Sequence, residues 1–431
     1  MSRSGETARP RQVTLGPIDP ILMREAGPMG NGSTAGNSAA NPAGKPASFS
    51  DAAFRQRLSA VLTETAAAKA LPNACYVDPG FLAFERSRLY EAGWACLGFG
   101  KDVPRPGDVV PRDLMGLPLI LLRDTAGEVR VFHNVCSHRG AELVTEPCHV
   151  GAVLRCPYHS WAYDLEGRLK STPFIGGPGV NRCDGFDKSA HGLKPVRAAV
   201  WFDMVFVNID GQAPDFSAYI APLAERWAMF DSSLIRHGGA DSSSTFDVRC
   251  NWKLAVENYC EAYHLPWVHP ALNTYSRLED HYNINEWDSF AGQGSRVYRP
   301  SLTETGEELP NFPDLPTQFR GGAEYAALFP NVLLGVHQDH FMAIRLEPVG
   351  VDRTLEHLEL YYVGDAALGD AYASIRSANL RAWKQVFSED VGVVERMQRG
   401  RRSPAFDGGV FSPFMDVPTH CFHKWAAQRL M

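Results

Sequence analysis

The sequence has no long apolar run, no excess of positive charge and no paired set of cysteines. No stretch approaches the ~20 apolar residues that a membrane-spanning helix needs. A formal net charge of −7 gives no basic footprint for nucleic acid or anionic lipid. The nine cysteines are an odd number, and the chain opens without the apolar core of a signal peptide. We therefore expect a cytoplasmic protein that binds neither membrane nor nucleic acid, in which cysteine clusters indicate metal rather than disulfides.

The composition is that of a globular protein with more than one domain: 431 residues, 45% hydrophobic and 21% charged. Gly, Pro, Ala, Ser, Thr and Asn dominate residues 27–48, so we expect 1–50 to be a flexible arm. Short β-type runs punctuated by Gly and Pro follow, and helical spacing is then mixed with strands. The expected fold class is α+β. An all-β domain with a preceding helical segment occupies 51–215, and a mixed α/β domain, an antiparallel sheet with helices, occupies 216–431.

Individual elements follow from hydrophobic periodicity. The expected strands of the first domain include Leu119–Arg123, Val129–Phe132, Ala152–Cys156 and Val200–Ile209. The second domain is expected to contain strands at Phe341–Leu346 and Leu355–Val363 and helices at Trp252–His264 and Ser377–Arg399.

Two short segments of the β domain each carry one cysteine and one histidine. They are Cys136-Ser-His138 and Cys156-Pro-Tyr-His159, with seventeen residues between them. Zinc fingers place Cys-Cys and His-His pairs on separate elements. One cysteine and one histidine per segment instead suit a [2Fe–2S] cluster, in which one iron takes two thiolates and the other two imidazoles. Both segments lie between β-type runs, so we expect two hairpin tips to close over the cluster; a zinc site is the alternative.

This part of the chain resembles the Rieske domain, whose pattern is Cys-x-His, a spacer, and Cys-x-x-His. The likeness extends to Arg139-Gly140 and to the run Pro157–Trp161. The resemblance implies a cluster that transfers single electrons and does no substrate chemistry itself. Its implied ligands are Cys136, His138, Cys156 and His159.

A second group of candidate ligands lies in Asn258–His269. Glu261 and His264 are three residues apart, so on one helix they share a face. Pro266 is expected to end that helix and to let His269 swing round to meet His264. Two histidines and one carboxylate form the facial triad that binds O₂-activating iron(II), so a third ligand is needed.

Asp390 is the expected third ligand. It lies on the apolar stripe of a predicted helix, three residues after Phe387 and four before Val394. An acid on a buried face is costly unless it is paired or bound to metal, so a paired arginine is the alternative. Glu389 and Glu395 lie off this stripe, and we expect both to be solvated.

Together these segments resemble the α subunit of Rieske non-haem iron oxygenases over about 81–430. The resemblance implies O₂, a small-molecule substrate and a separate NAD(P)H-dependent flavin or iron–sulfur reductase. It also implies a homotrimer in which Glu261 carries electrons between His264 and His159 of the partner subunit. The implied ligands of the mononuclear Fe(II) are His264, His269 and Asp390.

The spacing before the first histidine indicates a substrate class. Ring-hydroxylating members typically have Asn-x-x-x-Asp-x-Tyr-His, whereas this chain has Asn258-x-x-Glu261-x-Tyr263-His264. That form is similar to the branch that oxidises quaternary ammonium compounds such as glycine betaine, choline, carnitine and stachydrine. The resemblance implies a monooxygenase that hydroxylates an N-methyl carbon, with loss of formaldehyde and glycine betaine as a first candidate substrate. The alternatives are an aromatic ring-hydroxylating dioxygenase α subunit and a Rieske electron-transfer protein.

Other residues have suggestive patterns without a clear partner. His337-Gln-Asp-His340 and His420-Cys-Phe-His423 have ligand-like spacing, and we expect them to be structural or pocket residues. An aromatic cage would suit a cationic substrate. The second domain offers six aromatic candidates, none of which the sequence assigns to a cage: Tyr259, Trp267, Trp287, Phe290, Tyr325 and Phe341.

Overall fold

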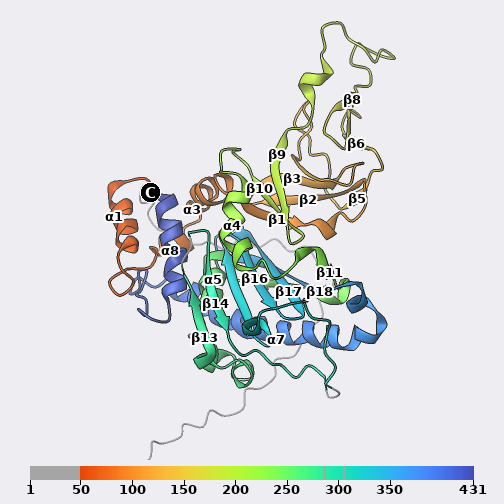
Figure 1. The fold of residues 1–431 in the computed structure, drawn as a ribbon. Helices are drawn as coiled ribbons and strands as arrows, with labels where there is room; N and C mark the ends of the chain where they lie inside the picture. The colour runs from red at the N-terminus through yellow and green to blue at the C-terminus, as the bar shows by residue number, and fades with distance from the viewer. Residues whose placement is uncertain (1–48, 286–287, 304–305) are drawn as a thin grey trace, which may run out of the picture. The chain divides into compact units, whose positions relative to one another are not determined.

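The computed structural model describes residues 49–285, 288–303 and 306–431. The chain divides into two units, of which the second, 48–431, is compact. The arm expected at 1–50 lies outside the described residues except for its last two positions. The described part of the second unit holds every candidate ligand, and its fold class is α+β, as the sequence predicts (Figure 1).

The all-β domain consists of two antiparallel sheets. The larger has the strand order β1-β10-β9-β4-β3-β2-β5, and the smaller is β6-β7-β8. The strands of the larger sheet are β1 (Ala95–Phe99), β2 (Asp108–Leu114), β3 (Leu117–Arg123), β4 (Val129–His133), β5 (Cys148–His149), β9 (Pro195–Trp201) and β10 (Met204–Asn208). The smaller sheet contains β6 (Val153–Arg155), β7 (Ala162–Asp164) and β8 (Leu169–Ser171).

The expected single strand at Val200–Ile209 is wrong, because the chain reverses within it. β9 and β10 form a hairpin in which Trp201 pairs with Met204. Phe202 and Asp203 make the two-residue turn with φ of 48° and 63°, which is the backbone of a primed turn. Neither of the two turn positions is Gly or Asn, the residues that usually signal such a turn. Contacts distant in sequence hold it instead: the Tyr361 hydroxyl donates to Asp203 Oδ2 at 2.8 Å.

An eight-stranded antiparallel sheet forms the frame of the second domain. Its order is β11-β18-β17-β16-β15-β14-β13, and β12 also pairs with β18. The strands are β11 (Ile235–His237), β12 (Ser243–Val248), β13 (His281–Ile284), β14 (Phe290–Ser295), β15 (Ala323–Leu328), β16 (Val332–His337), β17 (His340–Gly350) and β18 (Arg353–Val363). The two strands expected in this domain, at Phe341–Leu346 and Leu355–Val363, are therefore confirmed within β17 and β18.

The helices are α1 (Ala52–Ser59), α2 (Ala74–Val77), α3 (Phe81–Glu85), α4 (Phe216–Arg226), α5 (Trp252–Cys260), α6 (Leu265–Val268), α7 (Ala373–Gly400) and α8 (Val417–Leu430). The expected helix at Ser377–Arg399 is confirmed within α7. Across the described ranges, no helix combines the length and the apolar character needed to cross a membrane.

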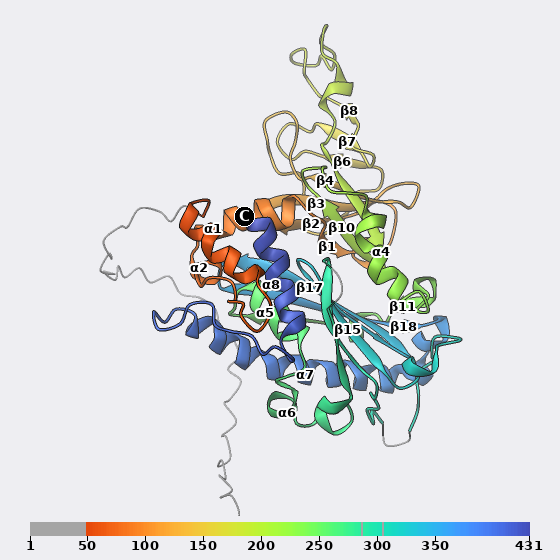
Figure 2. The same cartoon turned by 60° about the vertical axis from the view of Figure 1, so that its left-hand side comes forward.

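The central sheet is covered on both faces. α5 and α7 lie on one face, where they enclose the candidate iron site (Figures 1 and 2). The other face packs against β1, β10 and α4. Burial on both sides explains why the last four residues of β18, 360–363, are all apolar or aromatic: Leu360 and Tyr362 face the first core, and Tyr361 faces the second.

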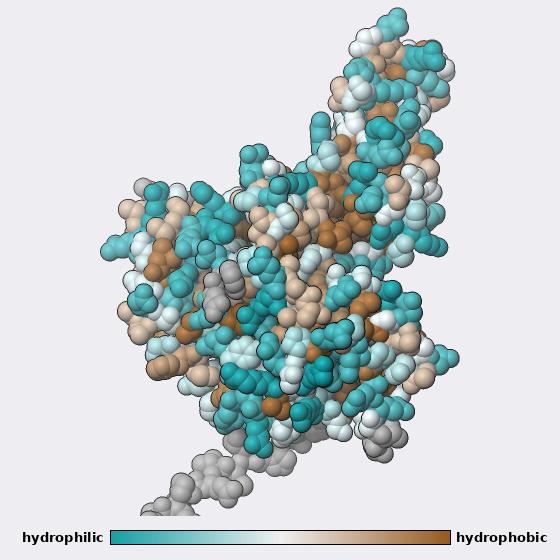
Figure 3. Space-filling model, in the orientation of Figure 1, coloured by the Kyte–Doolittle hydropathy of each residue, from teal (hydrophilic) through white to brown (hydrophobic). Residues whose placement is uncertain are grey.

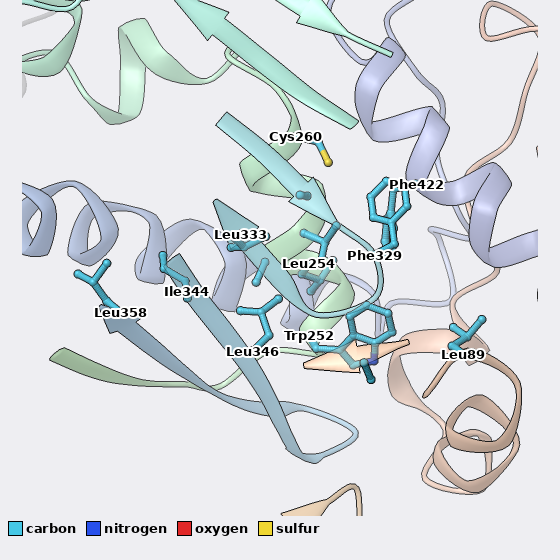
Figure 4. Close-up of a cluster of buried hydrophobic side chains, with 14 of the residues drawn as sticks. Leu89, Trp252, Leu254, Cys260, Phe329, Leu333, Ile344, Leu346, Leu358 and Phe422 are labelled. Atoms are coloured by element: carbon cyan, nitrogen blue, oxygen red, sulfur yellow. The ribbon is translucent and has the colours of Figure 1, made fainter. Parts of the chain in front are cut away.

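The larger hydrophobic core joins α5 to the strands beneath it. Figure 4 shows Leu254 of α5 close to Leu333 and Ile344 of the sheet, with Phe329 and Phe422 beside them. On the face shown in Figure 3, by contrast, hydrophobic residues occur in small groups among hydrophilic ones. The core therefore fixes α5, and with it the backbone that leads to the candidate ligands.

The helical segment that precedes the all-β domain packs against α5 and α8. Glu85 at the end of α3 forms an ion pair with Lys253 of α5, and both side chains are fully buried. Trp252 Nε1 donates to the other Glu85 oxygen at 2.9 Å, and the Lys253 ammonium lies 4.9 Å from the Trp252 ring centroid. A buried charge without its partner is strongly destabilising, so this pair ties the N-terminal helices to the start of α5.

We expect Glu85→Gln to lower the free energy of unfolding by about 3–5 kcal/mol, because it leaves the Lys253 ammonium buried without a counter-charge. Urea unfolding followed by circular dichroism measures this change. The matched control is Asp247→Asn, which breaks the exposed Arg353–Asp247 pair and should cost less than about 1 kcal/mol. Equal effects of the two substitutions would contradict the role given to Glu85.

Candidate metal centres

The two Cys/His segments form loops with the same backbone hydrogen bonds. In each loop the cysteine N–H donates to the carbonyl five residues later, and an N–H four residues later donates back to the cysteine carbonyl. These bonds are Cys136 to Ala141 (2.8 Å), Gly140 to Cys136 (3.0 Å), Cys156 to Trp161 (2.8 Å) and Ser160 to Cys156 (3.1 Å). Positive φ values of 75° at Gly140 and 55° at Ser160 close the loops.

The two loops bring together two buried thiols and two exposed imidazoles. Cys136 and Cys156 are each 2% exposed, whereas His138 and His159 are exposed and have ring centroids 4.7 Å apart. Burial raises the pKa of the Cys136 thiol, a hydrogen bond to Tyr163 lowers it, and the neighbouring Cys156 thiol raises it further. Metal binding would relieve this cost by deprotonating both thiols. The donor set fits a [2Fe–2S] cluster with two thiolates on one iron and two imidazoles on the other.

Two aromatic residues near the smaller sheet support these ligands. The Tyr163 hydroxyl of β7 lies 3.2 Å from Cys136 Sγ and accepts from the Ser137 N–H at 3.1 Å. Trp161 stacks on the His138 ring with centroids 4.6 Å apart. Hydrogen bonds to the sulfur ligands and fixed imidazoles are the means by which a protein tunes such a cluster. Tyr163 is a supporting residue that no motif in the sequence indicates.

The second constellation brings three ligand atoms to one point. His264 Nε2 and His269 Nε2 lie 3.6 Å and 3.0 Å from Asp390 Oδ1, and the three ligand atoms lie within 4.8 Å of one another. Asp390 Oδ1 is buried and accepts no hydrogen bond from the described residues. Its neighbouring ring nitrogens offer lone pairs, so the three groups repel one another unless a cation lies between them. This arrangement fits a metal held by two histidines and one carboxylate.

A carboxylate behind each ring fixes its orientation. Glu261 Oε1 lies 2.6 Å from His264 Nδ1, and Glu389 Oε2 lies 2.7 Å from His269 Nδ1. Because an ionised carboxylate only accepts, each Nδ1 carries the proton, and each Nε2 presents its lone pair to Asp390. Burial lowers the pKa of His269, but Asp390 and Glu389 outweigh this effect and raise it.

The position of Glu389 corrects the expectation that it is solvated. Glu389 and Asp390 are neighbours on α7, so their side chains lie about 100° apart around the helix. His269 occupies the space between them, with Asp390 at Nε2 and Glu389 at Nδ1. A stripe of apolar residues cannot reveal such a contact, because it depends on a ring that another segment places at the edge of the helix.

The expected helix Trp252–His264 is wrong over its last four residues. α5 ends at Cys260, and Glu261 is extended, with φ −125° and ψ 158°. The Glu261 carboxylate accepts the N–H groups of Tyr263 and His264, which hold the turn that follows. Pro266 then lies in the first turn of the short helix α6 rather than ending a helix, a position where its missing N–H costs nothing.

A pocket of about 50 Å³ opens onto the triad between α5, α7 and the sheet. Four aromatic rings line it: Tyr259, Tyr325, Trp383 and Phe387. Two of these were among the aromatic candidates. Of the others, Trp267 is 72% exposed, Phe290 and Phe341 belong to the core on the opposite face of the sheet, and Trp287 lies outside the described residues.

The two His-x-x-His sequences have different surroundings. His420 Nε2 lies 2.7 Å from the Val61 carbonyl, and His423 Nδ1 accepts from the Leu71 N–H at 3.0 Å. This pair is therefore structural and joins α8 to the N-terminal helices. His337 and His340 instead line a larger cavity of about 540 Å³. Both placements fall within the expectation of structural or pocket residues.

Comparisons with protein families identify the two domains. Residues 93–181 match the Rieske [2Fe-2S] domain, and residues 236–431 match the ring hydroxylating alpha subunit (catalytic domain). The first binds a [2Fe–2S] cluster and the second a mononuclear iron, so the expected cofactors are confirmed at the level of the domains.

Relatives and a solved structure agree with this assignment. The chain is 28% identical to choline monooxygenase, chloroplastic, of Arabidopsis thaliana over 82% of this chain and 81% of that protein. It is 27% identical to the glycine betaine monooxygenase oxygenase subunit of Chromohalobacter salexigens over 88% and 90%. A quaternary ammonium Rieske monooxygenase crystallised with its substrate L-carnitine has the same fold, with a TM-score of 0.69 and 22% identity over 84% and 96%.

We expect Glu389→Gln to lower the affinity for mononuclear iron about 10- to 100-fold, because it weakens the hydrogen bond that orients His269. Iron retained after dialysis against a chelator measures the loss, and the absorbance of the [2Fe–2S] cluster should not change. The control is Glu395→Gln on the same helix, whose carboxylate accepts from the Arg249 N–H instead. Unchanged iron retention in Glu389→Gln would show that this carboxylate does not support the site.

Proposed function

Since the chain joins a Rieske domain to a ring-hydroxylating catalytic domain and so belongs to the Rieske non-haem iron oxygenases, we propose that it demethylates a quaternary ammonium compound such as glycine betaine. The observation that carries this proposal is the aromatic lining of the pocket at the triad. Tyr259, Tyr325, Trp383 and Phe387 surround a space whose only acid, among the described residues that line it, is Asp390. Aromatic faces attract a cation that carries no N–H and cannot form a hydrogen bond.

The sequence before His264 and the relatives support the same class. The spacing Asn258-x-x-Glu261-x-Tyr-His is the form that we associate with quaternary ammonium substrates. The names of the relatives refer to choline and glycine betaine. The names of the similar proteins refer to three different compounds: choline, glycine betaine and L-carnitine. Quaternary ammonium compounds as a class are therefore better supported than any one of them.

We assign the ligands as follows. Cys136, Cys156, His138 and His159 hold the [2Fe–2S] cluster, and His264, His269 and Asp390 hold the mononuclear iron. When bound, the cluster supplies single electrons and the iron activates O₂. Glu261 and Glu389 keep the Nδ1 protons of the two histidines in place. The aromatic rings exclude water and hold the ammonium group so that one N-methyl carbon faces the triad.

The reaction balances with two electrons from a reductase. One oxygen atom of O₂ enters a C–H bond of an N-methyl group, and the other leaves as water after taking up two protons and two electrons. The hydroxymethyl product then loses its O–H proton and breaks its C–N bond, whose electron pair stays on nitrogen, to release formaldehyde and a tertiary amine. We propose that the reductase is a separate NAD(P)H-dependent flavin or iron–sulfur protein.

Glu261 is the proposed electron bridge between subunits. Its carboxylate contacts His264, and the neighbouring aromatic residues Tyr263 and Trp267 are 45% and 72% exposed. At the Rieske loops, His159 is exposed and Tyr158 is 58% exposed. Two exposed surfaces, each beside a redox ligand, favour a homotrimer in which His159 of the partner subunit docks at Glu261.

The first test is formaldehyde release under O₂, with a surrogate reductase and NADH, from a panel of quaternary ammonium compounds and simple aromatic acids. We expect formaldehyde to match oxygen uptake on one ammonium compound, since each turnover releases one molecule of formaldehyde. Peroxide measured in parallel reports uncoupling. No formaldehyde from any ammonium compound, together with a hydroxylated aromatic product, would replace the proposal with ring hydroxylation.

The second test concerns the bridge. Glu261→Gln should retain both metals and lose about 10- to 100-fold in turnover. The uncharged amide orients His264 less firmly and slows electron transfer from His159 of the partner subunit. Single-turnover oxidation of the pre-reduced cluster measures the electron transfer step directly. Glu279→Gln, an exposed acid on a neighbouring segment, is the control and should behave as the unaltered protein. Full turnover of Glu261→Gln would exclude the bridging role.

A further inference from the structure

Glu356 is a buried acid whose carboxyl group has no protein partner. It lies on β18, is 7% exposed, and forms no hydrogen bond or ion pair through its side chain with another described residue. Burial raises the pKa of Glu356, and the nearby Asp390 raises it further, to about 8, without a cation to offset either effect. A buried acid is costly unless it is paired, hydrogen-bonded or in contact with ordered water.

A small cavity of about 20 Å³ lies beside this carboxyl group, between α5, α7 and the sheet. Its polar lining includes Glu356, Asp390 and Asn258, and most of the remaining lining is apolar. Tyr259 also lines the cavity, but its hydroxyl donates to the Leu334 carbonyl at 2.8 Å and is therefore satisfied. Asp390 lines the pocket at the triad as well, so the cavity and the candidate iron site meet at this residue.

The volume and the lining of this cavity suit one water molecule. A buried water molecule needs roughly 10–15 Å³ and two to four polar partners. The cavity exceeds this volume only slightly, so it has room for a water molecule and not for a substrate. Glu356, Asp390 and Asn258 supply the polar groups. Because a water molecule has two donors and two acceptors, it can join two carboxyl groups in either protonation state of Glu356.

The three candidate iron ligands differ in how they are supported. His264 Nδ1 lies 2.6 Å from Glu261. His269 Nδ1 lies 2.7 Å from Glu389. Asp390 directs Oδ1 toward both histidines, and no described residue donates a hydrogen bond to that atom. Ligating carboxylates are usually hydrogen-bonded in turn, and such partners orient the ligand. Within the described part of the chain, Asp390 is therefore the ligand that lacks this support.

We propose that one water molecule in this cavity bridges the Glu356 carboxyl group to the second oxygen of Asp390, which makes Glu356 a positioning residue for the iron site. Glu356 supports Asp390 through water, as Glu261 and Glu389 support the histidines directly. This inference rests on the assignment of Asp390 as an iron ligand in the proposed function. It explains why an acid occupies a position of β18 that faces the apolar side chains of α5 and α7.

The first test compares two uncharged replacements. Glu356→Gln keeps a carbonyl and an N–H to bind the water molecule, whereas Glu356→Leu has a similar size and neither group. We expect the Leu variant to lower the affinity for mononuclear iron about 10- to 100-fold, and the Gln variant to stay within about threefold of the unaltered protein. Iron retained by the holoenzyme after dialysis against a chelator measures both effects.

The matched control is Glu395→Leu, which removes an acid of α7 that accepts from the Arg249 N–H and does not line the cavity. It should retain iron as the unaltered protein does. The absorbance of the [2Fe–2S] cluster verifies that each variant is folded. Both Glu356 variants lose the charge, so only hydrogen bonding distinguishes them. Equal iron retention in the two, whether high or low, would contradict the inference.

A second readout is independent of iron affinity. A crystal structure of the holoenzyme should show one water molecule about 2.7–3.2 Å from an oxygen of Glu356 and from an oxygen of Asp390. The Glu356→Leu variant should lack this water molecule. A dry cavity in the unaltered protein, or a Glu356 carboxyl group bonded directly to another side chain, would overturn the inference.

Asp390→Ala separates this inference from the proposed function. It should lose the mononuclear iron, because it removes a ligand. If Asp390→Ala loses the iron and Glu356→Leu retains it, the inference is wrong and the proposed function stands. If Asp390→Ala keeps the iron, the ligand assignment fails and the inference fails with it, whereas formaldehyde release still tests demethylation separately.

Discussion

Two histidines on one short segment must each present an unprotonated nitrogen to the same acid, and a carboxylate behind each ring enforces this. Glu261 and Glu389 hold the Nδ1 protons of His264 and His269, so both Nε2 atoms face Asp390. Without these two acids the rings could rotate or change tautomer, and the three ligand atoms would no longer converge. The rest of the catalytic domain holds these five side chains in fixed positions relative to one another.

Two helices on the same face of the sheet, α5 and α7, fix the positions of these side chains. α5, fixed by the large core and by the buried Glu85–Lys253 pair, delivers the chain to Glu261 at its end. α7 carries Asp390 and Glu389 as neighbours and Trp383 two turns earlier. One helix therefore carries a candidate metal ligand, the carboxylate that orients a second candidate ligand, and an aromatic side chain between the pocket and the larger cavity.

The two candidate metal centres differ in their exposure to solvent. The triad is enclosed by aromatic residues, which suits chemistry that must exclude water. The Rieske loops bury their thiols but expose both histidines, which suits electron exchange with another surface. Glu261 is related to both environments. It orients His264, a candidate ligand of the enclosed site, and it belongs to a segment with exposed aromatic residues. This division explains how one chain can serve both an electron donor and a small substrate.

The sequence by itself determined the two domains, the seven ligand candidates and most regular elements, because these depend on local spacing and periodicity. It could not reveal the turn at Phe202-Asp203 or the end of α5 at Cys260, since distant contacts override the local pattern there. Glu389 and the pairing of His340 with Trp383 were likewise beyond its reach. Only the tertiary structure decided which polar groups are satisfied, and among the described residues it left His337 without a hydrogen-bond partner, because hydrogen bonding between segments depends on where the whole fold places them.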